Sequence, residues 1–553
     1  MKKTLPIGED DFRIIRELEQ YYVDKTLMIK DFIEYGNKVT LITRPRRFGK
    51  TLNMTMLRDF FDATQDSREI FEGLAIMRTA HAERMNTVPV VSLSLKGCSG
   101  KTVEDLETAI AEDVRKEYVR YEPYLMGVDR ADKRYSRYFQ TLEVLEYEGD
   151  EKERNKHLQN NLIYLKNSLA YLIEALYTFY GVRPIVLIDE YDSPIIEAHQ
   201  GGFREEFSSF YSTFLTVVLK GNPHLGQAML TGIQRVAKES IFSKLNNIVV
   251  YTVLSEHYCQ YFGLTSEETG ELLDYYDVPS NDEVKSYYNG YLFSGRQIYN
   301  PWSILNYANE KKLRSYWLNT STNSLIREFV LEAGESFHRA FEKLIKNEEV
   351  TVMAILEAAF AELPETATLW GLLVNAGYLT VLHEDYEFET LTVRVPNREV
   401  RSEFQAIVSL YTKLSNQRLR NMLIALTKGE MDEFFEIYKE LVIESTSYHD
   451  AKENAYHMLM LGMSMNLRDI YDITSNIESG YGRSDLILKS KDAKRPHIII
   501  EFKQGEGVEK LKYEALQQIK DKKYYAGLTG ETLLIGLAHD KKMCQLVHEV
   551  MEI

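Results

Sequence analysis

Residues 41–54, LITRPRRFGKTLNM, constrain the fold of this chain more than any other stretch. Their second half, Gly49-Lys50-Thr51, ends the phosphate-binding pattern G-x-x-x-x-G-K-[ST], while Arg44 stands where the pattern has its first glycine. The apolar run KVTLIT leads into the segment, and the amphipathic run KTLNMTMLRDFFD leaves it. This order predicts a strand, a phosphate-binding loop and a helix whose N-terminus faces an anion.

The side chains of the loop have expected roles if it binds a nucleoside triphosphate. Lys50 would reach the β- and γ-phosphates, and the Thr51 hydroxyl would bind Mg²⁺. The predicted nucleotide-binding residues are Arg46, Arg47, Phe48, Gly49, Lys50 and Thr51. Pro45 could restrict the turn in place of the first glycine. In the alternative interpretation, the three arginines of the loop are only a solvated basic patch.

A second motif, PIVLIDEYD at residues 184–192, complements the loop. Its apolar run ends in Asp189, which would hold Mg²⁺, and Glu190, which would act as the general base toward water. The alternative is a strand end with two solvated acids. A further apolar run, AMLTGIQR, ends near Gln234 and Arg235. There a polar side chain could sense the γ-phosphate, or the arginine could act in trans within an assembly.

Another cluster lies in SNIESGYGRSDLILKSKDAKRPHIIIEFKQ, residues 475–504. Two strands are predicted in this segment. The first carries Asp485, and the second carries Glu501 and Lys503. Residues two apart in a strand share a face, so Glu501 and Lys503 point the same way and Phe502 points to the core. Two carboxylates and a lysine can hold a divalent metal and position water against a phosphodiester. The alternative is an ion pair worth under about 1 kcal/mol, but the flanking isoleucines favour a buried, functional cluster.

The order of apolar and helical patterns predicts the fold. Over residues 1–250, short apolar runs alternate with helices, which indicates a parallel sheet with crossover helices. The charged stretch EYEGDEKERNKH, residues 146–157, is predicted as an exposed turn. Residues 287–305 are predicted to form turns before a helix that starts near Pro301.

The remaining half of the chain has two further patterns. Residues 368–410 follow the order helix, strand, strand, helix, which fits a small winged-helix module. The last 80 residues return to strands.

Composition excludes some classes of protein. The net charge of −17 argues against a protein that coats nucleic acid with its whole surface, although a local basic groove stays open. Cys98, Cys259 and Cys544 lack metal-ligand spacing and indicate a reducing compartment. No apolar run reaches about 18 residues, and the N-terminus lacks the apolar core of a signal peptide. These features predict a cytoplasmic protein without a membrane span.

Residues 1 to about 250 resemble the bacterial AAA-ATPase-like family of P-loop proteins. The matching stretches are YYVDKT, LITRPRRFGKTLNMTML, PIVLIDEYDSPI and LTGIQRVAKESIFSKLNN, and YYNGYLF and IYNPWSIL resemble segments after the ATPase core. In that family the loop characteristically reads R-P-R-R-F-G-K-[ST]. Arg44 in place of glycine therefore looks like a trait of the family. The resemblance implies ATP and Mg²⁺ as ligands.

Residues from about 450 to 540 resemble the PD-(D/E)xK nuclease superfamily domain that is usually fused to it. The matching pieces are AYHMLMLGM, ESGYGRSDLIL, IIIEFK and ALQQIKDKKYY. The resemblance implies Asp485, Glu501 and Lys503 as the D…ExK core, with Mg²⁺ or Mn²⁺. It also implies a further metal-binding acid, predicted as Glu453 with Glu478 as the rival, and an accessory Gln518. The predicted metal ligands of the whole chain are Thr51, Asp189, Glu453, Asp485 and Glu501.

These observations predict an α/β protein with two catalytic centres. The predicted domains are a P-loop NTPase sheet domain over 1–255, a helical lid and winged-helix region over 256–440, and a restriction-endonuclease-like α/β domain over 441–553. ATP hydrolysis would be coupled to cleavage of nucleic acid, with DNA favoured over RNA and a homo-oligomer left open. One alternative is an ATP-driven switch or nucleic-acid-binding protein with an inactive nuclease-like domain. The other is a scaffold in which both motifs serve packing.

Overall fold

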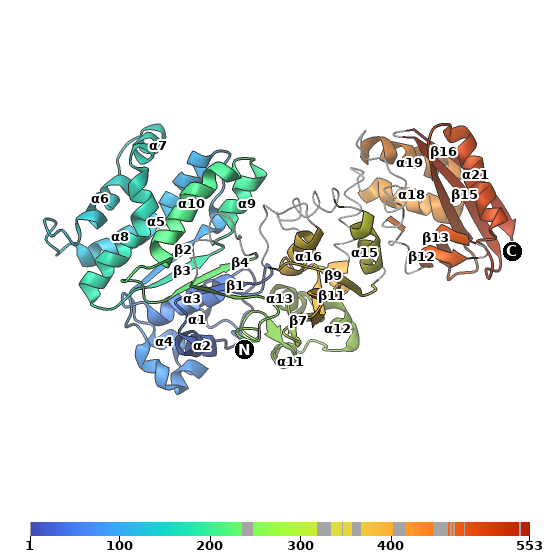
Figure 1. Ribbon diagram of the computed structural model, residues 1–553. Coiled ribbons are helices and arrows are strands. Elements are labelled where there is room, and N and C mark those ends of the chain that lie inside the picture. Colours follow the sequence, from blue (N-terminus) through green and yellow to red (C-terminus); the bar gives the residue numbers. More distant parts are fainter. Residues whose placement is uncertain are drawn as a thin grey trace. The chain divides into compact units, whose positions relative to one another are not determined.

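The computed structural model divides into two compact units, Met1–Val400 and Arg401–Ile553 (Figure 1). It describes residues 2–234, 247–317, 335–345, 347–356, 366–401, 416–445, 470–479, 482–540 and 543–553, together with Ala333, Met460, Met463, Ser464 and Leu467. The predicted domain boundaries at residues 255 and 440 stay predictions.

A five-stranded sheet lies at the centre of the first unit, and its strands are parallel, as predicted. Its strands are β1 (Val39–Thr43), β2 (Val90–Ser94), β3 (Ile185–Asp189), β4 (Ala228–Gly232) and β5 (Ile248–Tyr251), in the order β2-β3-β4-β1-β5. β1, β3 and β4 are buried at every position, which is typical of parallel strands covered on both faces. In this order, β4 separates the strand of the phosphate loop from the strand that ends in Asp189.

Helices cover both faces of this sheet (Figure 1). One face packs against α5 (Val103–Leu125), α6 (Ser136–Leu145), α8 (Leu162–Tyr180) and α10 (Arg204–Leu219). The other packs against α1 (Phe12–Glu17), α2 (Leu27–Tyr35), α3 (Lys50–Phe61) and α4 (Arg68–Phe71). Side chains of β3 alternate between the two cores, with Val186 and Ile188 on one face and Ile185 and Leu187 on the other.

Shorter elements complete this part of the unit. They are the 3-10 turns at Ala75–Arg78, Ala80–Arg84 and Leu95–Gly97, and the helices α7 (Glu151–Asn160) and α9 (Ser193–Gln200). The prediction of an exposed turn over residues 146–157 is wrong for its second half, because α7 begins there. Asp150 and Glu153 form a capping box that starts this helix.

The rest of the first unit contains two small sheets. The first, in the order β6-β8-β7, consists of β6 (Leu264–Thr265), β7 (Tyr291–Phe293) and β8 (Arg296–Tyr299), with helices α11 (Ser266–Tyr275), α12 (Asp282–Tyr288) and α13 (Pro301–Glu310). The predicted helix start at Pro301 is confirmed. The predicted turn lies between Phe293 and Arg296, and the strands β7 and β8 that it joins in a hairpin are not predicted.

The second small sheet has the order β10-β11-β9. Its elements are α15 (Glu335–Ile345), β9 (Val350–Met353), α16 (Thr366–Asn375), β10 (Thr380–Asp385) and β11 (Thr390–Arg394). The predicted order helix, strand, strand is confirmed by α16, β10 and β11. Residues 402–410, which complete the predicted module, lie outside the described residues.

The second unit contains a mixed sheet in the order β12-β13-β14-β15-β16. Its elements are α18 (Asn416–Lys428), α19 (Met431–Ser445), β12 (Tyr471–Ser479), β13 (Gly482–Ser490), β14 (His497–Gln504), α21 (Val508–Asp521), β15 (Glu531–Asp540) and β16 (Met543–Glu552). Only β14 and β15 are parallel, and α21 connects them and packs on both. None of the helices described in either unit has the length and apolar character needed to cross a membrane.

Candidate active sites

The loop between β1 and α3 is shaped by two residues with positive φ. Arg47 has φ 65°, and Gly49, which precedes α3, has φ 80°. Between them, the buried Phe48 ring lies with its centroid 5.0 Å from that of Tyr291 and 5.3 Å from that of Phe293. The loop is therefore anchored to β7, and Lys50 becomes the first residue of α3.

Arg44, in place of the usual glycine, is fully buried. Its guanidinium donates to the carbonyl oxygens of Thr43 (2.8 Å) and Tyr251 (2.9 Å) and lies 5.3 Å from the ring centre of Phe293. Burial lowers the pKa of Arg44 to about 9. The alternative interpretation of a solvated patch is therefore wrong for Arg44, whose side chain joins the loop to β5.

The other two arginines of the loop lie at a cavity. The guanidinium of Arg47 lies 4.3 Å from the ring centre of Trp302 and donates to the carbonyl oxygen of Tyr316 (2.9 Å). Burial lowers the pKa of Arg47. Arg46 and Arg47 both line a cavity of about 630 Å³, and Gly49 and Lys50 line it too. That volume is within the usual range for sites that bind small molecules.

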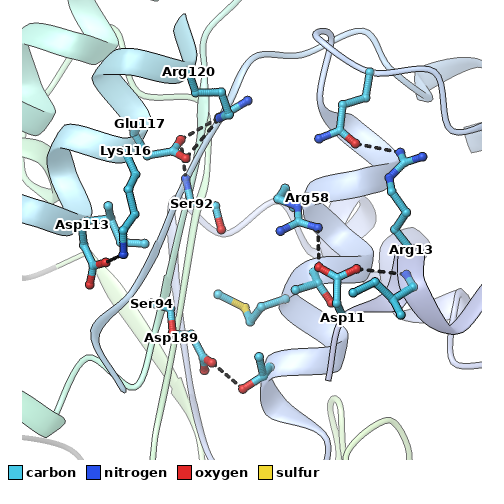
Figure 2. Close-up of a pocket in the computed structure, with 16 residues that line it drawn as sticks. Asp11, Arg13, Arg58, Ser92, Ser94, Asp113, Lys116, Glu117, Arg120 and Asp189 are labelled. Carbon is cyan, nitrogen blue, oxygen red and sulfur yellow. Dashed lines mark hydrogen bonds and ion pairs between the residues drawn. The ribbon is translucent and has the colours of Figure 1, made fainter. Parts of the chain in front are cut away.

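Lys50, Thr51 and Asp189 meet at this loop. Lys50 Nζ donates to the carbonyl oxygens of Arg44 (3.0 Å) and Pro45 (2.9 Å), and burial lowers its pKa. Thr51 Oγ1 donates to Asp189 Oδ2 at 2.6 Å, the bond drawn at Asp189 in Figure 2. The other carboxylate oxygen of Asp189 accepts a hydrogen bond from the Thr231 hydroxyl of β4. A hydroxyl and a carboxylate in contact supply the oxygen donors that Mg²⁺ prefers, so these residues fit that ion.

Glu190 and Asp192 follow directly after β3. Glu190 has φ 49°, lines the 630 Å³ cavity and accepts a hydrogen bond from Ser193 Oγ at 3.1 Å. Asp192, which sequence reasoning passed over, is buried and accepts the backbone N–H groups of Ile233 (2.8 Å) and Gln234 (3.0 Å). Burial raises the pKa of Asp192 to about 6. Asp192 thus fixes the end of β4 beside β3, while Arg235 lies outside the described residues.

A second cavity, of about 490 Å³, reaches Thr51 and Asp189 from β2 and α5 (Figure 2). Its cations face carboxylates, in the ion pairs Arg58–Asp11 (3.0 Å), Lys116–Asp113 (2.5 Å) and Arg120–Glu117 (2.6 Å). Gly49 and Lys50 line the first cavity and not this one. The first cavity is therefore the candidate place for a phosphate chain.

The predicted cluster near the C-terminus is assembled by one hairpin. Antiparallel pairing of Leu486 with Ile500 brings Asp485 beside Glu501. The backbone N–H of Asp485 donates to Glu501 Oε2 (3.3 Å), and that of Phe502 donates to Asp485 Oδ2 (2.8 Å). Lys503 Nζ lies 3.9 Å from Glu501 Oε1, so both side chains share a face while Phe502 is buried.

Helix α21 completes this cluster. The Glu501 side chain is 3% exposed and that of Lys503 is 29% exposed. Gln518 Nε2 donates to Glu501 Oε1 and to the Tyr524 hydroxyl (3.1 Å). Two adjacent carboxylates suit a divalent metal. Among the described side chains, no group of three or more His, Cys, Asp or Glu is arranged to hold a metal.

The sequence predicts Glu453 or Glu478 as a third acid beside this cluster. Glu453 lies outside the described residues. Glu478 lies in β12, in register with Arg483 of β13. The hairpin therefore supplies two carboxylates to this cluster, those of Asp485 and Glu501, and the third acid stays a prediction.

Two family models match the chain, and each matched range contains one of the candidate sites. Residues 6–242 match the family described as predicted AAA-ATPase, AAA-ATPase-like, and residues 451–549 match the PD-(D/E)XK nuclease superfamily. The resemblance to both families is confirmed. We call residues 6–242 the ATPase-like domain and residues 451–549 the nuclease-superfamily domain.

Two individual proteins are also similar to this chain. The chain is 27% identical over 546 residues to a protein of Azotobacter chroococcum mcd 1 described as an uncharacterized protein in the vnfD 5′ region, covering 95% of this chain and 93% of the relative. Among solved structures, a Walker-type ATPase of Pyrococcus abyssi is similar at 10% identity and a TM-score of 0.35, covering 69% of this chain and 96% of that one.

Proposed function

We propose that this protein binds and hydrolyses ATP at the phosphate loop and cleaves phosphodiester bonds of nucleic acid at the β13–β14 hairpin. The observation that carries the ATPase half is the direct contact of Thr51 with Asp189, which joins the phosphate loop to the acidic strand end. The nuclease half rests on the contact of Asp485, Glu501 and Lys503 within one hairpin.

In the ATPase-like domain, Lys50 would exchange its bonds to the loop carbonyls for bonds to phosphate oxygens. Arg46 and Arg47 would add positive charge, and Gly49 and Phe48 would hold the backbone of the loop in place. Thr51 and Asp189 would hold Mg²⁺, which neutralises charge on the phosphates when bound. Glu190 would take the proton of the attacking water. Arg235 would reach a neighbouring site only in a homo-oligomer.

In the nuclease-superfamily domain, Asp485 and Glu501 would hold Mg²⁺ or Mn²⁺, with Glu453 as a third ligand. Lys503 would orient water and offset charge that develops on the phosphate. The substrate would be nucleic acid, with DNA favoured over RNA, and nucleotide state would control access to it. We place the protein in the cytoplasm, because Cys98, Cys259 and Cys544 are all free thiols, as expected in a reducing compartment.

The ATPase half is tested with Lys50→Ala. We expect ATP turnover to fall by about 100-fold or more, because the lost ammonium stabilises the transferring phosphoryl group. Phosphate release is measured beside Lys101→Ala, which removes an exposed lysine outside both cavities. Turnover that is equal in the two variants would place the site elsewhere.

The nuclease half is tested with labelled single-stranded, duplex and branched DNA and with RNA, in Mg²⁺ or Mn²⁺. Each is assayed with ATP, with a non-hydrolysable analogue and without nucleotide. We expect cleavage that Asp485→Ala or Lys503→Ala abolishes and that Lys510→Ala, at an 85% exposed lysine, leaves intact. If every substrate stays uncut while ATP is hydrolysed, the alternative of an ATP-driven switch with an inactive nuclease-like domain takes its place.

A further inference from the structure

The β10–β11 hairpin ends in a loop that exposes two aromatic side chains. Tyr386 is 82% exposed and Phe388 is 68% exposed. Met353 of β9, which is 61% exposed, lies at the same end of this sheet, because it pairs with Thr390, and Thr390 pairs with Asp385. Large apolar side chains that are exposed together are typical of an interaction surface. We call Met353, Tyr386 and Phe388 the apolar tip.

The loop that carries the tip has a fixed conformation. The Asp385 carboxylate accepts hydrogen bonds from the backbone N–H groups of Glu387 (3.0 Å) and Phe388 (3.1 Å). Glu389, the last residue of the loop, has φ 51° and returns the chain to β11. Side-chain bonds of this kind stabilise a turn. The aromatic side chains are therefore presented from an ordered backbone, which lowers the entropy that binding would cost.

The surroundings of the tip are acidic. Residues 384–390 contain no Lys or Arg and four acids: Glu384, Asp385, Glu387 and Glu389. These charges repel the phosphates of nucleic acid, so the hairpin of the predicted winged-helix region is unsuited to bind DNA or RNA. A partner that fits the tip has exposed apolar surface together with a surplus of Lys or Arg.

A surface of this kind lies on the same chain, where α5 leads into α6. Met126 is 68% exposed there. It is followed by four exposed cations: Arg130, Lys133, Arg134 and Arg137. Arg134 pairs with Asp132 at 2.6 Å, whereas in the described part of the chain the other three cations form no ion pair. We call Met126 and these four cations the basic corner.

Two arginines of the basic corner already lie over aromatic rings. The Arg130 guanidinium is 4.9 Å from the ring centre of Phe139, and that of Arg137 is 5.3 Å from the ring centre of Tyr171. A planar guanidinium can receive a second ring on its other face while its N–H groups bond to carboxylates. The tip supplies both kinds of group.

We propose that the apolar tip of one copy of this chain binds the basic corner of a second copy. Tyr386 and Phe388 lie against Met126 and the arginines, and the four acids face the cations at the rim of the contact. Because the tip and the corner are different surfaces, the contact is heterologous, and copies join into a ring or an open chain. Neither surface lines the two cavities beside the phosphate loop, so the contact does not occupy the proposed ATP site.

Sedimentation velocity on the full chain, over a range of protein and salt concentrations, measures this contact. We expect reversible association that weakens as salt rises, because the charges at the rim are screened. A variant with both Tyr386→Ser and Phe388→Ser should raise the dissociation constant by about 100-fold, since two aromatic anchors are lost. Tyr513→Ser, at a 58% exposed tyrosine of α21, is the matched control and should leave it unchanged.

Charge reversal tests the basic corner. One variant carries Arg130→Glu and Arg137→Glu, which places an acidic corner opposite the acidic tip. A second variant carries Glu384→Lys, Glu387→Lys and Glu389→Lys, which places a basic tip opposite the basic corner. We expect each variant alone to stay monomeric and an equimolar mixture to associate, because the reversed tip fits the reversed corner. Urea denaturation followed by tryptophan fluorescence checks that each variant is folded.

Three outcomes would overturn the inference. If the unmodified protein is monomeric at every concentration, the tip is left to bind a different protein. If the tip variants weaken association and the corner variant does not, the tip binds another surface of the second copy. If Tyr386→Ser with Phe388→Ser weakens binding of duplex DNA and leaves self-association unchanged, the tip contacts nucleic acid instead.

Discussion

The two candidate sites bring their functional groups together in opposite ways. In the ATPase-like domain, Thr51 and Asp189 touch across 138 residues, and Thr231, which bonds to the same carboxylate, is 42 residues from Asp189. In the nuclease-superfamily domain, the contact between Asp485 and Glu501 spans 16 residues, and Gln518 reaches Glu501 across 17. The first site depends on the order of strands in a sheet, and the second depends on the register of one hairpin.

This difference predicts where each site is vulnerable. β4 lies between β1 and β3, so a shift of β4 would separate Thr51 from Asp189 without changing either residue. In the other domain, the pairing of β13 with β14 sets the distance between Asp485 and Glu501 directly. In that domain, α21 must also stay packed on β15, because α21 carries Gln518.

The largest effect expected from this comparison is at Gly536, which pairs with Glu501 across β14 and β15. A Cβ there would lie 2.3 Å from the Lys512 carbonyl oxygen and 2.8 Å from the Leu516 nitrogen. Both atoms belong to the backbone of α21, so the helix must move and carry Gln518 away from Glu501. We expect Gly536→Ala to lower the free energy of unfolding of this unit by about 3 kcal/mol and to abolish cleavage.

The measurement uses the distribution of tryptophans. Trp302, Trp317 and Trp370, the three tryptophans of the chain, all lie in the first unit. Circular dichroism during urea denaturation should therefore show the loss, while tryptophan fluorescence and ATP turnover should not change. A variant with an unaltered dichroism transition would break the claim that α21 must stay close to β15.

Two buried ionisable groups, one in each domain, contribute to stability with opposite dependence on pH. Burial lowers the pKa of His539 to about 3, whereas in the unfolded chain it is near its ordinary value of 6.5. The unfolded state then binds more protons between these values, so stability falls as pH drops below 6.5. Between pH 6.5 and 4.5 this loss is about 2 kcal/mol, and His539→Gln should remove it.

Asp192 acts in the other direction. Its pKa is raised by burial from 3.8 to about 6, so the folded state binds more protons between these values, and its contribution to stability rises as pH falls through them. Asp192→Asn should therefore remove a gain of about 2 kcal/mol between pH 6.5 and 4.5. Denaturation at both pH values, followed by dichroism for His539→Gln and by fluorescence for Asp192→Asn, checks the two signs. The same sign for both groups would contradict the comparison.

The sequence predicts local geometry well because the period of a strand is short. Glu501 and Lys503 had to share a face, and a hairpin had to bring Asp485 near them. The strands that end at Thr43 and Asp189 could also be located from their apolar runs. What sequence could not show is the destination of the Arg44 side chain. Its acceptor is the Tyr251 carbonyl oxygen, 207 residues away on a strand that the apolar pattern did not identify.

For two further elements, helix α7 and the β7–β8 hairpin, composition predicts turns although the sequence also contains a local signal for the element that forms. The strong charge of residues 146–157 predicts a turn, although Asp150 and Glu153 are spaced as the capping box that starts α7. The Gly and Asn content of residues 287–305 predicts turns, whereas β7 and β8 form a hairpin there. Its centre, Ser294 and Gly295, has φ 49° and 76°, the backbone of a two-residue hairpin loop.

The smallest effect on stability is expected at Gly232, which pairs with Thr43 at the ends of β4 and β1. The effect of a change there on ATP turnover is expected to be larger. A Cβ there would lie 2.7 Å from Asp192 Oδ1 and 2.8 Å from Tyr191 Cε1. These are side-chain atoms, which shift more readily than a helix backbone, so Gly232→Ala should cost about 1 kcal/mol by tryptophan fluorescence.

The same shift loosens the bonds from Asp192 to the backbone of Ile233 and Gln234, and with them the end of β4. Because Thr231 of that strand bonds to Asp189, we expect ATP turnover to fall by about ten-fold, more than the small loss of stability suggests. Phosphate release measured well below the unfolding transition separates the two effects. Full turnover in a destabilised variant would mean that the contact of Thr51 with Asp189 does not depend on the strand between them.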